Sequence, residues 1–200
     1  MRVGIDVDGC LANFNSGFIR RVIEVTGRNL FPDNYEPTTW DYPTAVGYTE
    51  DEVNKVWENI QADPLFWLRL PVYQGTCGFL MNLARQHHDV YFITARPGIE
   101  AKMQTELWLE VAGYESATVL ITSKKGLAAR TLDLDIYLDD RWENAKDVAV
   151  LSDGFTAHGK TIPPRYSTTK TFLLDRPWNR LGDETAYGVT RIASLSQFPL

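Results

Sequence analysis

Short apolar runs alternate with helical patterns over most of the chain. Runs with the length of buried strands lie at 2–5, 89–93, 118–121, 135–138 and 170–174. Apolar residues recur at the spacing of amphipathic helices over 75–86, 100–112, 127–132 and 143–148. Because strands alternate with helices, the pattern predicts an α/β fold with a parallel central sheet covered on both faces, a Rossmann-like three-layer sandwich.

The residues between the first strand and Pro71 follow a different pattern. Apolar residues recur at helical spacing over 14–25, and a second helix is expected to begin after Thr49 and to end at Asp63. Proline and aromatic residues are frequent over 30–48, which is typical of irregular chain. A structureless stretch of about sixty residues is uncommon in a compact domain, so we predict a helical cap inserted after the first strand. The cap would comprise 14–73, and the core 1–13 and 74–200.

Two acidic residues follow the first predicted strand directly. Asp6 and Asp8 are separated by one residue, and Gly9 allows a sharp turn because glycine tolerates positive φ. Carboxylates this close repel each other unless they stay hydrated or bind a cation. They also stand at the C-terminal end of a strand, where open α/β sheets bind ligands. The motif indicates a Mg²⁺ site for phosphoryl transfer, although a polar strand-to-loop turn would show the same residues.

Polar residues follow three other predicted strands. Thr94 comes after the strand at 89–93, Lys124 and Lys125 after that at 118–121, and Asp139 and Asp140 after that at 135–138. Right-handed crossovers place the C-terminal ends of parallel strands on one rim of the sheet. Mg²⁺ prefers oxygen ligands, and a lysine can offset the charge of a transferring phosphoryl group. We therefore predict that these side chains form one site.

Composition narrows the class of protein. The 200 residues are 44% hydrophobic and 12% aromatic, which suits one domain, or one domain with an insertion. A net charge of -6 argues against a nucleic-acid polymer as partner but allows a small anion held by a metal. Two cysteines, Cys10 and Cys77, are too few for a disulfide framework. Without a membrane span or signal sequence, we predict a soluble cytoplasmic protein, and a homodimer stays open.

The ordered motifs resemble those of the haloacid dehalogenase superfamily of phosphatases. The matching residues are 6–11 as the first motif, 93–97 as the second, Lys125 as the third and 137–141 as the fourth. The resemblance covers about 1–149, and the position of the cap is similar to that of helical-cap members. More narrowly, 6–14, the Phe66-Trp67 pair and the short spacing from lysine to the aspartate pair resemble the 5'(3')-deoxyribonucleotidase group.

This resemblance implies catalytic roles for the first motif. Asp6 would be the nucleophile that forms an aspartyl phosphate, and Asp8 would protonate the leaving oxygen and then activate water. The activity implied is Mg²⁺-dependent hydrolysis of a phosphomonoester, a nucleoside monophosphate in the 5'(3')-deoxyribonucleotidase group. A phosphatase of another small phosphomonoester, such as a sugar phosphate, and a catalytically silent ligand-binding relative are the alternatives.

It also implies binding roles. Mg²⁺ would be held by Asp6, the backbone carbonyl of Asp8, and the Asp139-Asp140 pair, with Asp140 favoured as the direct ligand. Residues implied to bind the phosphate are Thr94, the N–H of Ala95, and Lys125 in preference to Lys124.

Several residues keep more than one interpretation. Arg96 is either a surface cation or a contact for the phosphate. Phe66, Trp67 and Trp40 could stack on a base or form the cap's own core. The segment 175–180 could rim the site or anchor the C-terminal tail. The base, the sugar and the preference for 5' or 3' phosphates depend on the geometry of the cap.

Overall fold

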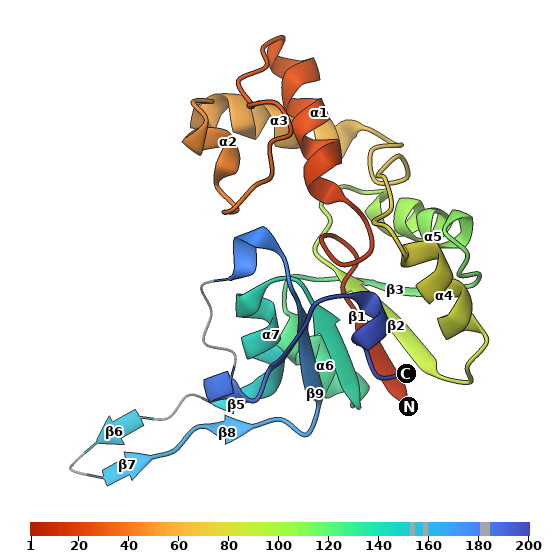
Figure 1. Cartoon of the computed structure of the whole chain (residues 1–200), viewed down its shortest axis with the longest axis vertical. Coiled ribbons are helices and arrows are strands. Elements are labelled where there is room, and N and C mark those ends of the chain that lie inside the picture. Colours follow the sequence, from red (N-terminus) through yellow and green to blue (C-terminus); the bar gives the residue numbers. More distant parts are fainter. Residues whose placement is uncertain (153–154, 158–159, 181–184) are drawn as a thin grey trace.

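A six-stranded sheet runs through the centre of the molecule in the computed structural model (Figure 1). The structure describes residues 1–152, 155–157, 160–180 and 185–200. The strand order is β10-β9-β4-β1-β2-β3, and every neighbouring pair is parallel. The strands are β1 (Arg2–Ile5), β2 (Asp89–Thr94), β3 (Thr118–Ile121), β4 (Ile136–Asp139), β9 (Lys170–Leu174) and β10 (Thr190–Ile192).

Helices cover both faces of this sheet. They are α4 (Thr76–Ala84), α5 (Ala101–Val111), α6 (Lys125–Leu132) and α7 (Trp142–Ala149). Neighbouring residues of β2 show the two faces: Phe92 packs in the cluster that includes Leu80 of α4 and Trp108 of α5, and Ile93 packs with Ala129 of α6. The predicted three-layer α/β sandwich is confirmed. None of the described helices has the length and apolar character needed to cross a membrane.

Three helices lie together beyond the C-terminal ends of the strands: α1 (Phe14–Thr26), α2 (Tyr42–Ala45) and α3 (Glu50–Ala62) (Figure 1). Helix α1 ends at Gly27, whose left-handed φ of 68° and N–H bond to the Ile23 carbonyl form a C-cap. Helix α3 begins with the expected capping box, in which Thr49 and Glu52 satisfy each other's backbone N–H groups. Aromatic rings fill the space between these helices, as the rings of Phe18 and Trp57 do at 4.9 Å.

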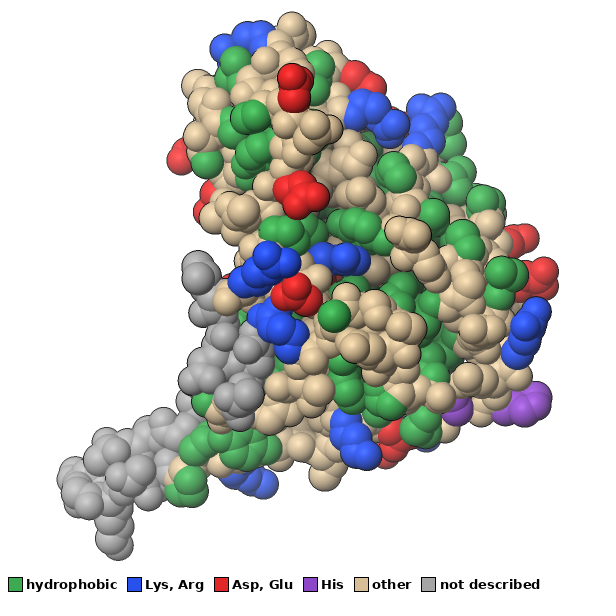
Figure 2. All heavy atoms as spheres, in the orientation of Figure 1, with side chains coloured by type: hydrophobic (Ala, Val, Ile, Leu, Met, Phe, Trp, Pro, Cys, Tyr) green, Lys and Arg blue, Asp and Glu red, His purple; other side chains and the backbone are tan. Residues whose placement is uncertain are grey.

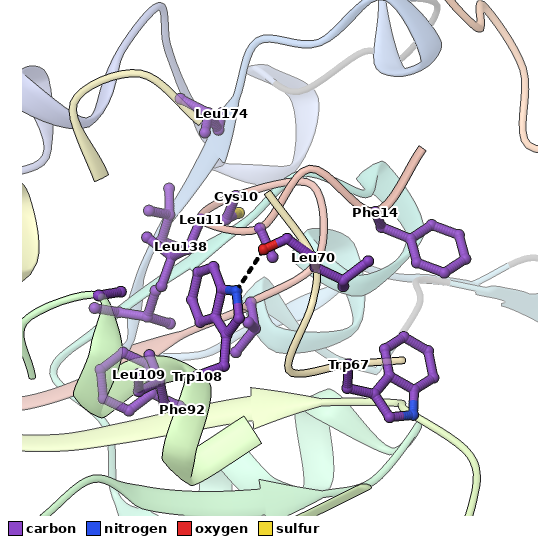
Figure 3. Packing of buried hydrophobic residues seen from close by; sticks show 14 of the residues in the cluster. Cys10, Leu11, Phe14, Trp67, Leu70, Phe92, Trp108, Leu109, Leu138 and Leu174 are labelled. Carbon is purple, nitrogen blue, oxygen red and sulfur yellow. Dashed lines mark hydrogen bonds between the residues drawn. The ribbon is translucent and has the colours of Figure 1, made fainter. Parts of the chain in front are cut away.

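Two adjacent stretches of backbone, one leaving the core and one returning to it, join the helical cap to the core. The N–H of Asn13 donates to the carbonyl of Pro71 at 2.7 Å, and the N–H of Tyr73 donates to that of Leu11 at 2.9 Å. The indole of Trp108 donates to the carbonyl of Leu70 at 2.8 Å from within the buried cluster (Figure 3). These bonds pair the outgoing and returning chain, so the cap has a defined origin on the core. The boundaries at residues 13 and 73 stay a prediction.

The sequence predicts that the strand at 170–174 is the final one, and the C-terminal part of the structure corrects this prediction. The strand at Lys170–Leu174 is not the last strand of the sheet, because β10 pairs with it in parallel at the edge. Two short antiparallel pairs also precede it, β5 (Val150–Ser152) with β8 (Arg165–Tyr166), and β6 (Phe155–Ala157) with β7 (Lys160–Ile162). These strands have two or three residues each, which is too short for a hydrophobic period to be visible.

Candidate active site

Residues from three strand ends line a cavity of about 160 Å³ between the sheet and the cap. Asp6 follows β1, Thr94 ends β2, and Lys125 begins α6 after β3. Ala95 and Asp8 line the same cavity. Figure 2 shows acidic and basic side chains gathered where the cap meets the core on the viewed face. The parallel sheet therefore brings together the motif residues that lie far apart in the sequence.

Asp6 and Lys125 form a buried ion pair at the floor of this cavity. The ammonium of Lys125 donates to Oδ1 of Asp6 at 2.6 Å and to the carbonyl of Ile93 at 2.5 Å. Burial raises the pKa of Asp6 to about 7, with Lys125 opposing the shift and Asp139 adding to it. Burial lowers the pKa of Lys125, but the attraction of Asp6 and Asp139 outweighs it and the net pKa is raised. Lys124 is exposed, so the structure places Lys125 at the site.

Asp8 is held by the second motif. The guanidinium of Arg96 makes a two-pronged contact, with Nε 2.9 Å from Oδ2 and Nη2 2.8 Å from Oδ1. The hydroxyl of Thr94 donates to Oδ2 at 3.2 Å. The side chain of Asp8 is 18% exposed, so it keeps a surface toward the cavity.

Arg96 lies in the core, where several side chains fix its position. Its side chain is fully buried, with the guanidinium 4.9 Å from the ring centre of Trp67 and 5.9 Å from that of Trp108. A third bond from Nη1 reaches the hydroxyl of Thr105 at 2.9 Å. The interpretation as a surface cation is therefore wrong. In this structure the guanidinium binds Asp8, and the sequence contained no signal for that pairing.

The two aspartates of the fourth motif have different surroundings. Both oxygens of Asp139 already accept hydrogen bonds, Oδ2 from the hydroxyl of Tyr137 and Oδ1 from Asn144 and the N–H of Arg141. Asp140 is fully buried, and its Oδ1 has no partner among the described residues. Burial, followed by repulsion from Asp6 and Asp139, raises the pKa of Asp140. A buried carboxylate oxygen without a donor is suited to a cation.

The surroundings of Asp140 fit Mg²⁺. Carboxylate oxygens of Asp6 and Asp140 and the sulfur of Cys10 lie within 4.8 Å of one another. Burial, with the nearby carboxylates of Asp140 and Asp6, raises the pKa of the Cys10 thiol well above its usual range, so the sulfur stays protonated. The donors left are hard oxygens, which Mg²⁺ prefers. Asp6 and Asp140 are therefore the residues here that would hold the metal, and the resemblance adds the backbone carbonyl of Asp8.

Gly9 allows Asp140 of the fourth motif to lie close to the first motif. Its φ is +84°, which L side chains rarely adopt, and a Cβ there would lie 2.0 Å from Oδ2 of Asp140. No other residue type fits at this position without moving the carboxylate. The glycine within the first motif is thus required both by the turn and by the close approach of Asp140.

The segment after β9 supports the same half of the site. Arg176 donates to the carbonyl of Gly9 at 2.7 Å, and the indole of Trp178 donates to Oδ2 of Asp140 at 2.8 Å. The amide of Asn179 donates to the Asp140 carbonyl at 2.7 Å. The sequence left the role of 175–180 open, and the structure places it at the rim of the site. The first two of these bonds join residues 167 and 38 positions apart, which a linear sequence does not reveal.

Aromatic side chains close the cavity on the cap side. Trp40 and Trp67 line it, as predicted candidates for contact with a substrate, together with Phe14 and Trp57. Phe66 is not brought to the cavity, because it is 1% exposed and packs edge-on to Trp67 in the hydrophobic core. Pro97 and Arg141 line the cavity from the second and fourth motifs, and the lining residues for which the sequence predicted no role are Phe14, Trp57, Ser123 and Asn144.

Solved structures show which class of fold this is. A haloacid dehalogenase-like family hydrolase from Streptococcus pneumoniae superimposes with a TM-score of 0.58 at 13% identity, covering 98% of this chain and 95% of that one. A "predicted phosphatase" from Clostridium acetobutylicum gives a TM-score of 0.58 at 14% identity, covering 98% and 94%. The fold of this chain is that of the haloacid dehalogenase-like hydrolases.

Sequence similarity points to a narrower group. A protein of Halalkalibacterium halodurans named "Putative nucleotidase" is 27% identical over 96% of this chain and 87% of its own length. A protein of the same name from Oceanobacillus iheyensis is 29% identical over 46% of this chain, and the match spans half of that protein. No family model matches the sequence. The chain resembles these bacterial proteins in sequence and shares its fold with the dehalogenase-like hydrolases.

Proposed function

We propose that this protein is a Mg²⁺-dependent phosphomonoester hydrolase that acts on nucleoside monophosphates, with deoxyribonucleotides preferred. The observation that carries the proposal is the convergence of Asp6, Asp8, Thr94 and Lys125 on one cavity, with a carboxylate oxygen of Asp140 near Asp6 and one Asp140 oxygen without a partner among the described residues. A nucleophile, an acid/base, a phosphate cradle and a metal ligand are the parts that this reaction needs.

The chemistry follows from the positions of the two first-motif acids. Asp6 forms a bond from a carboxylate oxygen to phosphorus, and the bond from phosphorus to the ester oxygen breaks. Asp8 gives a proton to that leaving oxygen. In the second half, Asp8 takes a proton from a water that attacks phosphorus, and the carboxylate of Asp6 is released. Arg96 fixes the orientation of Asp8 for both proton transfers, and the Thr94 hydroxyl turns from Asp8 to the phosphate when the substrate binds.

The remaining groups bind the phosphate and offset its negative charge. Lys125 keeps Asp6 oriented and offsets the negative charge of the phosphoryl oxygens. The hydroxyl of Thr94 and the N–H of Ala95 are the proposed phosphate donors. Bound Mg²⁺ would supply positive charge to the transferring group at Asp6 and Asp140.

The aromatic wall supports a nucleoside as the leaving group. The rings of Phe14, Trp40, Trp57 and Trp67 face the cavity from the cap side. Stacking of a base on an aromatic side chain contributes about 1–3 kcal/mol. Relatives named as nucleotidases are consistent with this choice.

The size of the cavity favours a second candidate, a phosphatase of a compact phosphomonoester such as a sugar phosphate. The cavity has a volume of about 160 Å³, whereas pockets for drug-sized ligands are roughly 300–1,000 Å³. A nucleoside monophosphate would either extend beyond this cavity or require the cap to move outward.

The experiment that separates these candidates is a turnover assay of the purified protein with matched panels. Nucleoside 5'- and 3'-monophosphates, in ribo and deoxy forms, are compared with sugar phosphates, with Mg²⁺ or with EDTA. We expect the highest kcat/KM for a deoxyribonucleoside monophosphate, no turnover in EDTA, and none for Asp6→Asn. Turnover of sugar phosphates alone would reject the nucleotidase assignment. Activity that survives Asp6→Asn would reject the nucleophile, and inactivity on both panels would support a silent relative.

A further inference from the structure

The half-buried indole of Trp178 contacts both the metal-binding half of the site and the cap. It lies in the single turn η1 (Pro177–Asn179) directly after β9. Its N–H donates to Oδ2 of Asp140 at 2.8 Å, while Oδ1 of the same carboxylate has no partner among the described residues. The indole therefore decides which carboxylate oxygen of Asp140 remains for a cation.

The backbone around Trp178 is held tightly against the core. The amide of Asn179 donates to the carbonyls of Asp140 and Leu174, each at 2.7 Å. The guanidinium of Arg176 donates to the carbonyl of Gly9 at 2.7 Å and lies 4.0 Å from the ring centre of Tyr73. With residues on both sides fixed, the indole has a defined position relative to the first and fourth motifs.

The other contact of this indole is with the cap. The ring of Trp40, in the loop between α1 and α2, meets the ring of Trp178 edge-on at 5.7 Å. The guanidinium of Arg141 lies 4.7 Å from the ring centre of Trp40. Arg141 directly follows Asp140 in the sequence, and Trp178 donates a hydrogen bond to Asp140. Trp40 therefore contacts two core residues that adjoin the proposed metal ligand. Trp40 also lines the catalytic cavity.

We propose that Trp178 is a positioning residue for the metal ligand Asp140 and that its contact with Trp40 couples Mg²⁺ binding to docking of the cap loop. This inference rests on the metal site of the proposed function. Hydrogen-bond partners of metal ligands orient them, and their loss commonly weakens metal binding about 10–100-fold. Coupling between two sites is reciprocal, so a docked cap loop strengthens Mg²⁺ binding and bound Mg²⁺ strengthens docking.

The test measures the Mg²⁺ affinity of the metal-free protein by titration calorimetry, without substrate. Trp178→Phe keeps a ring against Trp40 but lacks the N–H donor, and we expect affinity to fall about 10–100-fold. Trp40→Ala leaves Asp140 and its donor in place, and we expect a fall of about fivefold or more. The double variant should lose less than the product of the two single effects. Trp142→Phe is the matched control, because Trp142 is half-buried and packs on Tyr187 instead, and its affinity should equal that of the wild type.

Each outcome bears on a separate claim. Wild-type affinity in Trp178→Phe would overturn the positioning role, and wild-type affinity in Trp40→Ala would overturn the coupling. Wild-type protein that binds no Mg²⁺ would instead reject the metal site of the proposed function. Thermal unfolding in EDTA shows whether each variant folds. A measurement that needs no variant is the indole N–H resonance of Trp178 in ¹⁵N-labelled wild type, which should shift on Mg²⁺ addition while that of Trp142 stays; an unshifted Trp178 resonance would also overturn the proposal.

Discussion

Asp140 carries an electrostatic cost in the metal-free protein. Its carboxylate is fully buried, one oxygen is bound by Trp178, and the other has no partner among the described residues. Charge repulsion from Asp6 and Asp139 adds to the cost of burial. Such an arrangement is expected where a side chain serves a ligand and not the fold, since active sites trade stability for function.

Asparagine at this position should therefore stabilise the metal-free protein. The folded-state pKa of Asp140 is raised above its ordinary value of 3.8, so the cost is absent below that pH and grows as the pH rises toward the raised value. Asp140→Asn keeps the shape and the acceptor for Trp178 but removes the charge. We expect a gain of about 1–3 kcal/mol in unfolding free energy at pH 8, and a smaller gain at pH 5. Urea unfolding in EDTA at both pH values measures it. A gain of equal size at both would show that the charge is not its cause.

For individual residues, the sequence predicted which side chains come together at the site but not which of them pair with each other. Asp6, Asp8, Thr94 and Lys125 each follow a strand, so the rule that parallel strand ends share a rim was enough to bring them together. The pairing of Arg96 with Asp8, 88 residues apart, depends on a buried slot between two indoles that no local pattern encodes.

The turn between β1 and α1 is the element on which both halves of the site depend. The N–H of Gly9 donates to the carbonyl of Ala12 at 2.9 Å and the N–H of Leu11 to that of Val7 at 2.9 Å, which folds the motif back on itself. This compact turn carries Asp6 and Asp8 and leaves room for Asp140 at Gly9. Its geometry links Asp6, the proposed nucleophile, to Asp140, the proposed metal ligand, which directly follows the neighbouring strand β4.

Alanine at Gly9 should damage this turn more than it damages an ordinary left-handed position. A left-handed L-residue costs about 1–2 kcal/mol, and here the added Cβ would also meet the carboxylate of Asp140 at 2.0 Å. Gly27→Ala is the matched control, because Gly27 has φ +68° and a Cβ added there would meet no atom of the described residues within 4 Å. We expect Gly9→Ala to lose more unfolding free energy than Gly27→Ala and to lose Mg²⁺ binding, which Gly27→Ala keeps. Equal losses in the two variants would contradict the clash.

The longer elements were predictable, whereas the short ones were not, including α2 (Tyr42–Ala45), which lies within the stretch 30–48 that the sequence indicated as irregular. The expected strands at 2–5, 118–121 and 170–174 agree with the structure, as does the helix that begins with the Thr49 capping box. Strand β10 has three residues with Arg191 at its centre, so neither its length nor its polarity signals a strand. It forms because β9 offers an open edge beside it.

For the whole molecule, the proposed function depends on how the cap sits over the core. Beside the paired chain crossings, Gln104 of α5 joins the two parts: its Oε1 accepts from the N–H of Trp67 at 2.9 Å, and its Nε2 donates to the carbonyl of Asp63 at 3.2 Å. The side chain is 3% exposed. One core residue thus satisfies two backbone groups at the end of the cap and sets the position of Trp67 above Arg96.

Removing this side chain should loosen the cap without unfolding the core. Gln104→Ala leaves a buried N–H and a carbonyl unpaired, a loss of about 1–3 kcal/mol. Because the affected groups belong to the returning chain at Asp63 and Trp67, hydrogen exchange should accelerate over 63–70 while β1 and β4 stay protected. KM for the nucleotide should rise, since Trp67 lines the cavity. The exposed Gln61→Ala on α3 is the control, expected within about 0.5 kcal/mol of wild type. Unchanged exchange over 63–70, or faster exchange spread over the whole sheet, would show that Gln104 does not hold the cap to the core.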